Sequence, residues 1–255
     1  MELAFKQYGN KDNPPIIILH GLFGMLDNWQ YHAKLLGEQY AVFAVDLRNH
    51  GRSPHSSVMT FAAMAQDIAE FCQKHHLNNI ILLGHSMGGK VAMQFAVDFP
   101  QFLSKLIIAD IGPQAYPPAH GIYFRAFNEI DFSKFQTRQE ADEAFAKYEA
   151  NVGIRMFLLK NLERADKGFQ LKCNVQAIEA AYNEISGKID IPFPISIPTL
   201  FMRGEKSGYI REKDLADIKE LFPFAEFVTI KDAGHWLHAE NQGQFYQELI
   251  KFLDQ

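Results

Sequence analysis

Short apolar runs alternate with stretches of helical periodicity, and this alternation limits the fold more than any other feature of the 255-residue sequence. The runs PIIILH at 15–20 and YAVFAVD at 40–46 are continuously apolar, as expected for strands that are buried on both faces. Helical spacing follows at 60–74 and again at 87–98. Further strands are expected at 79–84, 103–111, 199–203 and 226–230. Strands joined by helices predict an α/β fold, with a mostly parallel sheet flanked by helices and right-handed crossovers.

The alternation stops after Pro113 and resumes near residue 191. Between these two positions the sequence shows no convincing strand. The spacing of apolar residues there predicts helices at 122–129, 137–152, 154–161 and 176–185. We interpret residues 113–190 as a helical cap over the carboxyl edge of the sheet. The α/β core then comprises residues 1–112 and 191–255. Aromatic side chains of the insertion either line an acyl pocket or form the core of the cap itself.

Composition and charge exclude several classes of function. The 30 Asp and Glu residues exceed the 25 Lys and Arg residues, for a net charge of −5. A chain without a basic stripe is a poor candidate for binding nucleic acid or an anionic membrane. Two cysteines, Cys72 and Cys173, are too few for a disulfide framework or a multi-cysteine zinc site. Because no apolar run approaches about 18 residues and the start MELAFK does not resemble a secretory signal, we expect a cytoplasmic protein. The oligomeric state stays open.

The segment Gly84-His85-Ser86-Met87-Gly88-Gly89 lies between a predicted buried strand and a predicted helix. This G-x-S-x-G pattern is typical of a nucleophile elbow, in which a strained turn exposes the serine hydroxyl above the edge of the sheet. Glycines on both sides of the serine allow the strand and helix backbones to approach closely. The pattern alone is weak evidence, and its position between strand and helix is what makes Ser86 the candidate nucleophile.

Two backbone amides are candidates for an oxyanion hole. The first amides of the helix that begins at Met87 have no partner within the helix, so the Met87 N–H is one donor. The second is expected in His20-Gly21-Leu22-Phe23-Gly24, at the carboxyl end of the first predicted strand. We expect the Leu22 N–H in this role, with the Phe23 N–H as the alternative. The Phe23 side chain is also a candidate for the substrate pocket.

A serine hydroxyl needs a base to remove its proton, and ten histidines compete for that role. His235 lies in Asp232-Ala233-Gly234-His235-Trp236, directly after the last predicted strand, where it can reach the same edge of the sheet as Ser86. His238 is the rival. The other eight histidines are less suitable. Three adjoin other motifs, and five lie on helix faces or loops with polar surroundings: His32, His55, His75, His76 and His120. A zinc site at His235 and His238 lacks a third ligand, so no metal is expected.

The motifs HGLFG, DLRNHGRS, GHSMGG and DAGHW, in this order, resemble those of the α/β-hydrolase superfamily. The combination is similar to that of the small YbfF-like esterases. In most such enzymes the catalytic acid follows the strand before the histidine strand, commonly as Gly-x-x-Asp. The corresponding loop here reads Gly204-Glu205-Lys206-Ser207, so that Ser207 occupies the usual position of the acid.

Three carboxylates are therefore candidates for holding the histidine tautomer. Asp110 ends the strand that follows the predicted helix at 87–98, here called the elbow helix. Some α/β-hydrolases place the catalytic acid at this position, so we predict Asp110 as the acid. Glu205 lies in the usual loop but two residues early. Asp46 ends another strand, and we expect it to pair with Arg48 in a structural loop. Ser207 is then expected to bond Asp110 or His235 as a fourth member of the site, the alternative being an ordinary loop serine.

The expected activity is cofactor-free hydrolysis of carboxylic esters, and of acyl thioesters as a further class, through Ser86, His235 and Asp110. Haloalkane dehalogenases and epoxide hydrolases need an aspartate at the elbow. This chain has Ser86 there, which argues against both activities. Carbon–carbon bond hydrolases and cofactor-free perhydrolases keep the serine and remain alternatives. So does a ligand receptor built on a hydrolase scaffold, for which an incomplete set of catalytic residues would be typical.

Overall fold

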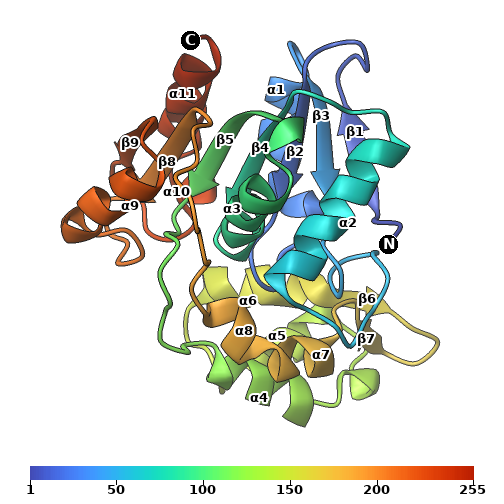
Figure 1. Cartoon of the computed structure of the whole chain (residues 1–255). Helices are drawn as coiled ribbons and strands as arrows, with labels where there is room; N and C mark the ends of the chain where they lie inside the picture. The colour runs from blue at the N-terminus through green and yellow to red at the C-terminus, as the bar shows by residue number, and fades with distance from the viewer.

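A seven-stranded sheet forms the centre of the computed structural model, which describes residues 1–255 (Figure 1). The strand order is β1-β3-β2-β4-β5-β8-β9, and every neighbouring pair is parallel except β1 with β3. The strands are β1 (Phe5–Tyr8), β2 (Pro15–Leu19), β3 (Ala41–Val45), β4 (Ile80–His85), β5 (Leu103–Ala109), β8 (Thr199–Gly204) and β9 (Ala225–Ile230). The predicted α/β fold is confirmed. Strand β1 was not predicted, because its four residues are mostly exposed at the edge and carry no apolar run.

Alternate side chains of each central strand enter different layers of the core. Ile17 and Leu19 of β2 belong to a cluster with side chains of helices α2 and α3, whereas Ile16 and Ile18 belong to one with side chains of α1 and α11. The helices of the core are α1 (Gln30–Leu36), α2 (Phe61–Lys74), α3 (Met87–Asp98), α9 (Leu215–Leu221), α10 (Leu237–Glu240) and α11 (Gln242–Leu253). Burial on both faces explains why these strands read as continuous apolar runs. None of the helices combines the length and apolar character needed to cross a membrane.

Five helices and a small hairpin lie between β5 and β8, below the sheet in Figure 1. They are α4 (Gly121–Glu129), α5 (Arg138–Phe145), α6 (Val152–Leu158), α7 (Val175–Ala180) and α8 (Tyr182–Ser186), with strands β6 (Leu162–Arg164) and β7 (Phe169–Leu171). The expectation of no strand in this region was wrong, since three-residue strands are too short to show a periodicity. The helix expected at 137–152 was too long: it ends at Phe145, and Asn151 caps the next helix by accepting the amide of Gly153.

Lys90 connects the elbow helix to both ends of this insertion. It lies on α3, is 1% exposed, and its Nζ donates hydrogen bonds to the carbonyls of Gln114 (2.7 Å) and Gly187. The two connecting segments also bond each other, through the Tyr116 amide and the Ser186 carbonyl at 2.9 Å. Burial lowers the pKa of Lys90 to about 8. Because α3 begins directly after Ser86, these contacts connect both ends of the insertion to the helix that follows that serine.

Candidate active site

Ser86 lies on a tight turn between β4 and α3, with φ of 53° and ψ of −120°. This left-handed backbone conformation is costly for a residue other than glycine. The turn depends on close packing of its neighbours. A β-carbon at Gly84 would lie 2.2 Å from the Gly88 carbonyl oxygen, and one at Gly88 would lie 2.5 Å from the Leu19 carbonyl oxygen. The local sequence therefore builds the turn that exposes the serine hydroxyl at the carboxyl edge of the sheet.

We expect Gly84→Ala to lower the free energy of unfolding by about 3 kcal/mol, because its methyl group would collide with rigid backbone. Gly243→Ala is the matched control, since a β-carbon there meets open space in the first turn of α11. We expect that change to alter stability by less than about 1 kcal/mol. Urea unfolding of the two variants measures the difference. Equal stabilities would contradict the close packing of the elbow.

His235 follows β9, on the loop that leads into α10, and its ring contacts Ser86. The Nε2 atom lies 2.9 Å from Ser86 Oγ. One face of the imidazole stacks on the Tyr209 ring, with centroids 4.0 Å apart and an interplanar angle of 18°. The backbone is held as well, because the His85 ring hydrogen-bonds the His235 carbonyl at 2.8 Å through Nε2. These contacts fix both the position and the orientation of the ring.

Asp110 directly follows β5, with φ of 51°, and its side chain is fully buried. One carboxylate oxygen accepts the Gly204 amide at 2.9 Å, and the other accepts the Ser207 hydroxyl and lies 2.7 Å from His235 Nδ1. Since a carboxylate only accepts hydrogen bonds, Nδ1 carries a proton and Nε2 is left to accept from Ser86. Hydroxyl, imidazole and carboxylate thus form one hydrogen-bonded series, in which Ser207 contacts the carboxylate rather than the imidazole.

The two alternative acids lie outside this series. Glu205 is exposed and accepts the backbone amide of Asp232 at 2.9 Å. Asp46 accepts the amides of Leu26 (2.7 Å) and Arg52 (2.9 Å), which closes a loop. The predicted pairing of Asp46 with Arg48 was wrong, as the following contacts show.

Arg48 turns to α2, where its Nε lies 2.6 Å from a carboxylate oxygen of Asp67. The spacing of two residues between Asp46 and Arg48 did not reveal this partner, because Asp67 lies on a helix that only the fold brings next to Arg48.

His238 has no hydrogen bond with Ser86. It is buried and stacks on Trp29, with ring centroids 4.3 Å apart, and burial lowers its pKa to about 3. His32, which we expected in polar surroundings, is instead buried, and its Nε2 hydrogen-bonds the His238 carbonyl at 2.7 Å. Both rings serve as core side chains beneath the site.

The two candidate oxyanion donors border the space in front of Ser86. Leu22 and Met87 both line it, and the Leu22 amide makes no hydrogen bond within the protein. The Met87 amide is the first of α3 and has no partner within the helix. The Leu22 loop is held from the cap, where the side-chain amide of Asn161 donates to the Phe23 carbonyl at 2.7 Å.

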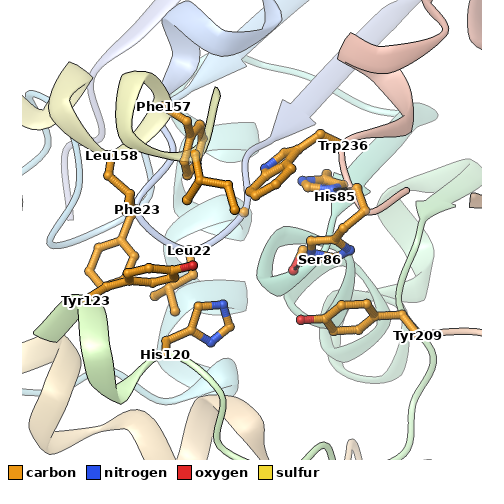
Figure 2. Close-up of a pocket in the computed structure, with 13 residues that line it drawn as sticks. Leu22, Phe23, His85, Ser86, His120, Tyr123, Phe157, Leu158, Tyr209 and Trp236 are labelled. Carbon is orange, nitrogen blue, oxygen red and sulfur yellow. Dashed lines mark hydrogen bonds between the residues drawn. The ribbon is translucent and has the colours of Figure 1, made fainter. Parts of the chain in front are cut away.

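A cavity of about 170 Å³ opens between Ser86 and the cap (Figure 2). It is mostly apolar, and Phe23, Phe157 and Trp236 contribute to its walls. A second, smaller cavity of about 50 Å³ lies beside it. The residues common to both are Leu22, Ser86, His120 and Tyr209. A substrate bound at Ser86 could therefore place one group in each compartment.

Several residues of this site were not predicted. His120, Tyr209 and Trp236 line the larger cavity, and Asn161 holds the Leu22 loop. Phe157 also lines this cavity, in agreement with one of the two alternatives stated for the aromatic side chains of the insertion. Trp236 follows His235 in the chain and Tyr209 follows Ser207 by two positions, so proximity to predicted residues was a usable signal for these two. No signal of this kind existed for His120 or Asn161, because they belong to the cap and reach the site only through its packing.

Three comparisons relate the chain to known proteins. A family model described as alpha/beta hydrolase fold matches residues 14–242. The chain is 35% identical to sn-1-specific diacylglycerol lipase ABHD11 of Danio rerio, over 96% of this chain and 80% of that protein. It is also 35% identical to Esterase YbfF of Escherichia coli strain K12, over 95% of this chain and 94% of that protein.

Among solved structures, a marine microorganism esterase superposes with a TM-score of 0.95 at 42% sequence identity. The match covers 98% of this chain and 99% of that one. The similarity therefore includes the region between β5 and β8 as well as the sheet.

Proposed function

Since the chain belongs to the alpha/beta hydrolase family, we propose that it is a serine hydrolase that cleaves carboxylic esters through an acyl-enzyme intermediate. The observation that carries this proposal is the hydrogen-bonded series from Ser86 through His235 to Asp110. The esterase and lipase relatives support hydrolysis as the reaction class.

In the proposed reaction, His235 Nε2 accepts the proton of the Ser86 hydroxyl as the oxygen attacks the ester carbonyl. The amides of Leu22 and Met87 donate hydrogen bonds to the oxyanion that forms. Asp110 stabilises the imidazolium, which then donates its proton to the leaving alcohol. Water, deprotonated by the same imidazole, hydrolyses the acyl-enzyme and restores Ser86.

A hydrolysis profile over aryl esters and acyl thioesters of graded chain length tests this proposal. The compartments of about 170 and 50 Å³ next to Ser86 are small, so we expect short and medium acyl groups to react fastest. We expect kcat/KM to fall for long acyl chains, which would have to displace cap side chains. Absence of hydrolysis across the whole panel would contradict an ester hydrolase.

We further propose that Ser207 positions Asp110. Its hydroxyl is one of three donors to that carboxylate, so its loss leaves the carboxylate less firmly oriented. We expect Ser207→Ala to lower kcat about 10-fold, with KM changed little. Ser207→Thr keeps the hydroxyl and should retain most of the activity. An unchanged kcat in Ser207→Ala would instead make Ser207 an ordinary loop serine.

A further inference from the structure

His120 is held by the hydroxyl of Tyr182 in a way that decides which ring nitrogen carries a proton. The Tyr182 oxygen accepts two backbone amides, those of Ala119 at 3.0 Å and His120 at 3.1 Å. The same oxygen lies 2.5 Å from His120 Nδ1. A phenol oxygen has two acceptor positions and one proton. Because both acceptor positions are used, the hydroxyl donates its proton to Nδ1, and the ring proton of neutral His120 resides on Nε2.

The Nε2–H group of His120 has no partner within the protein, although the residue lines both compartments next to Ser86. Burial lowers the pKa of His120 to about 4, so the ring is neutral near pH 7 and the tautomer argument applies. A neutral N–H donor in a mostly apolar cavity is a strong orienting group, because leaving it without an acceptor is costly once a substrate displaces water.

Tyr209 presents a second polar group to the same space. Figure 2 shows its hydroxyl pointing across the cavity toward His120. This hydroxyl makes no hydrogen bond within the protein, whereas the Tyr209 carbonyl accepts the Tyr116 hydroxyl at 2.8 Å, which anchors the residue. The ring is fixed by its stacking on His235. His120 and Tyr209 therefore offer two preoriented polar groups beside the attacking serine.

We propose that His120 Nε2–H binds an acceptor oxygen of the substrate that lies a few bonds from the scissile carbonyl, with the Tyr209 hydroxyl as the second contact. The substrate class is then an ester that carries a further ether, hydroxyl or carbonyl oxygen, rather than a simple alkyl ester. The inference rests on the proposed ester hydrolysis. The additional oxygen belongs to either the acyl group or the alcohol, since His120 borders both compartments.

Two pairs of matched esters test the proposal. Para-nitrophenyl pentanoate and para-nitrophenyl β-methoxypropanoate differ by an oxygen in the acyl chain, and butyl acetate and methoxyethyl acetate differ by an oxygen in the alcohol. For each pair the measured quantity is the selectivity, defined as kcat/KM of the oxygenated ester divided by kcat/KM of the alkyl ester. The intrinsic reactivity of the esters cancels when the selectivity of a variant is compared with that of the wild type.

We expect His120→Phe to lower the selectivity about 10-fold in at least one pair, and the affected pair identifies the compartment that holds the oxygen. His120→Gln retains an N–H donor and should keep the selectivity within about 3-fold of the wild type. Tyr182→Phe removes the hydroxyl that fixes the tautomer and holds the Ala119 and His120 amides, so it should lower the selectivity although the imidazole itself is retained. It also carries the test if His120→Phe fails to fold.

Tyr148→Phe is the matched control, because this cap tyrosine donates to Glu129 on the surface, away from the cavity. It should leave the selectivity unchanged. The inference would be overturned if His120→Phe and Tyr182→Phe lowered kcat/KM equally for both esters of each pair, so that the selectivity did not change. That result would leave the proposed function intact. Failure of the wild type to hydrolyse any of the four esters would overturn the proposed function and the inference together.

Discussion

Ser86→Ala is expected to lower kcat for ester hydrolysis by about 10⁴–10⁶. The substitution removes the only hydroxyl within hydrogen-bond distance of His235 Nε2, so no covalent acyl-enzyme can form. Backbone geometry at the elbow should survive, because alanine and serine are similar in size. Steady-state hydrolysis of a para-nitrophenyl ester measures the loss, and the residual rate reports what the oxyanion donors and binding supply without a nucleophile.

Labelling with a fluorophosphonate provides an independent measurement of the same residue. We expect one equivalent of label on the wild-type chain, detected as a mass increase of the intact protein, and none on Ser86→Ala. Ser57→Ala, at an exposed serine in a loop, is the control and should label like the wild type. If Ser86→Ala kept its hydrolytic rate or its label, another residue would be the nucleophile and the proposed mechanism would be wrong.

The second large effect is expected for Asp110→Asn, which should lower kcat about 10⁴-fold with little change in KM. An asparagine amide turned toward His235 donates to Nδ1 and places the ring proton on Nε2, where it can no longer accept the serine proton. Asparagine also has one acceptor oxygen in place of the two that bind Gly204, Ser207 and His235. The pH profile of kcat for Asp110→Asn, measured with an aryl ester, should show no recovery of activity in the neutral range.

Glu205→Gln is the matched control for this change. Glu205 is exposed and bonds the Asp232 amide, so its loss should leave kcat within about 2-fold of the wild type. Fluorophosphonate labelling of Asp110→Asn, slowed but still confined to Ser86, would show that the variant is folded. Near wild-type turnover in Asp110→Asn, combined with a large loss in Glu205→Gln, would reverse the assignment of the acid.

Much of the fold could be predicted because the information is local. Central strands are buried on both faces, so they read as apolar runs, and the elbow helix was predicted with its bounds at 87 and 98. Edge and cap elements were predicted less well. β1 and the β6–β7 hairpin are short, and the end of α5 at Phe145 depends on the capping of the next helix by Asn151. Such elements are stabilised by contacts with distant segments, which leave little pattern in the sequence.

By itself, the sequence determined the tight turn at Ser86 and the loop that carries His235, because the glycines and the strand–turn–helix order around them are neighbours in the chain. It left Asp110, Glu205 and Asp46 as competing acids, since each follows a predicted strand or lies in the usual loop. Only the tertiary structure shows which of these carboxylates lies against His235. Gly204, Ser207 and His235 all donate to Asp110, and they meet it only because β5, β8 and the loop after β9 lie side by side.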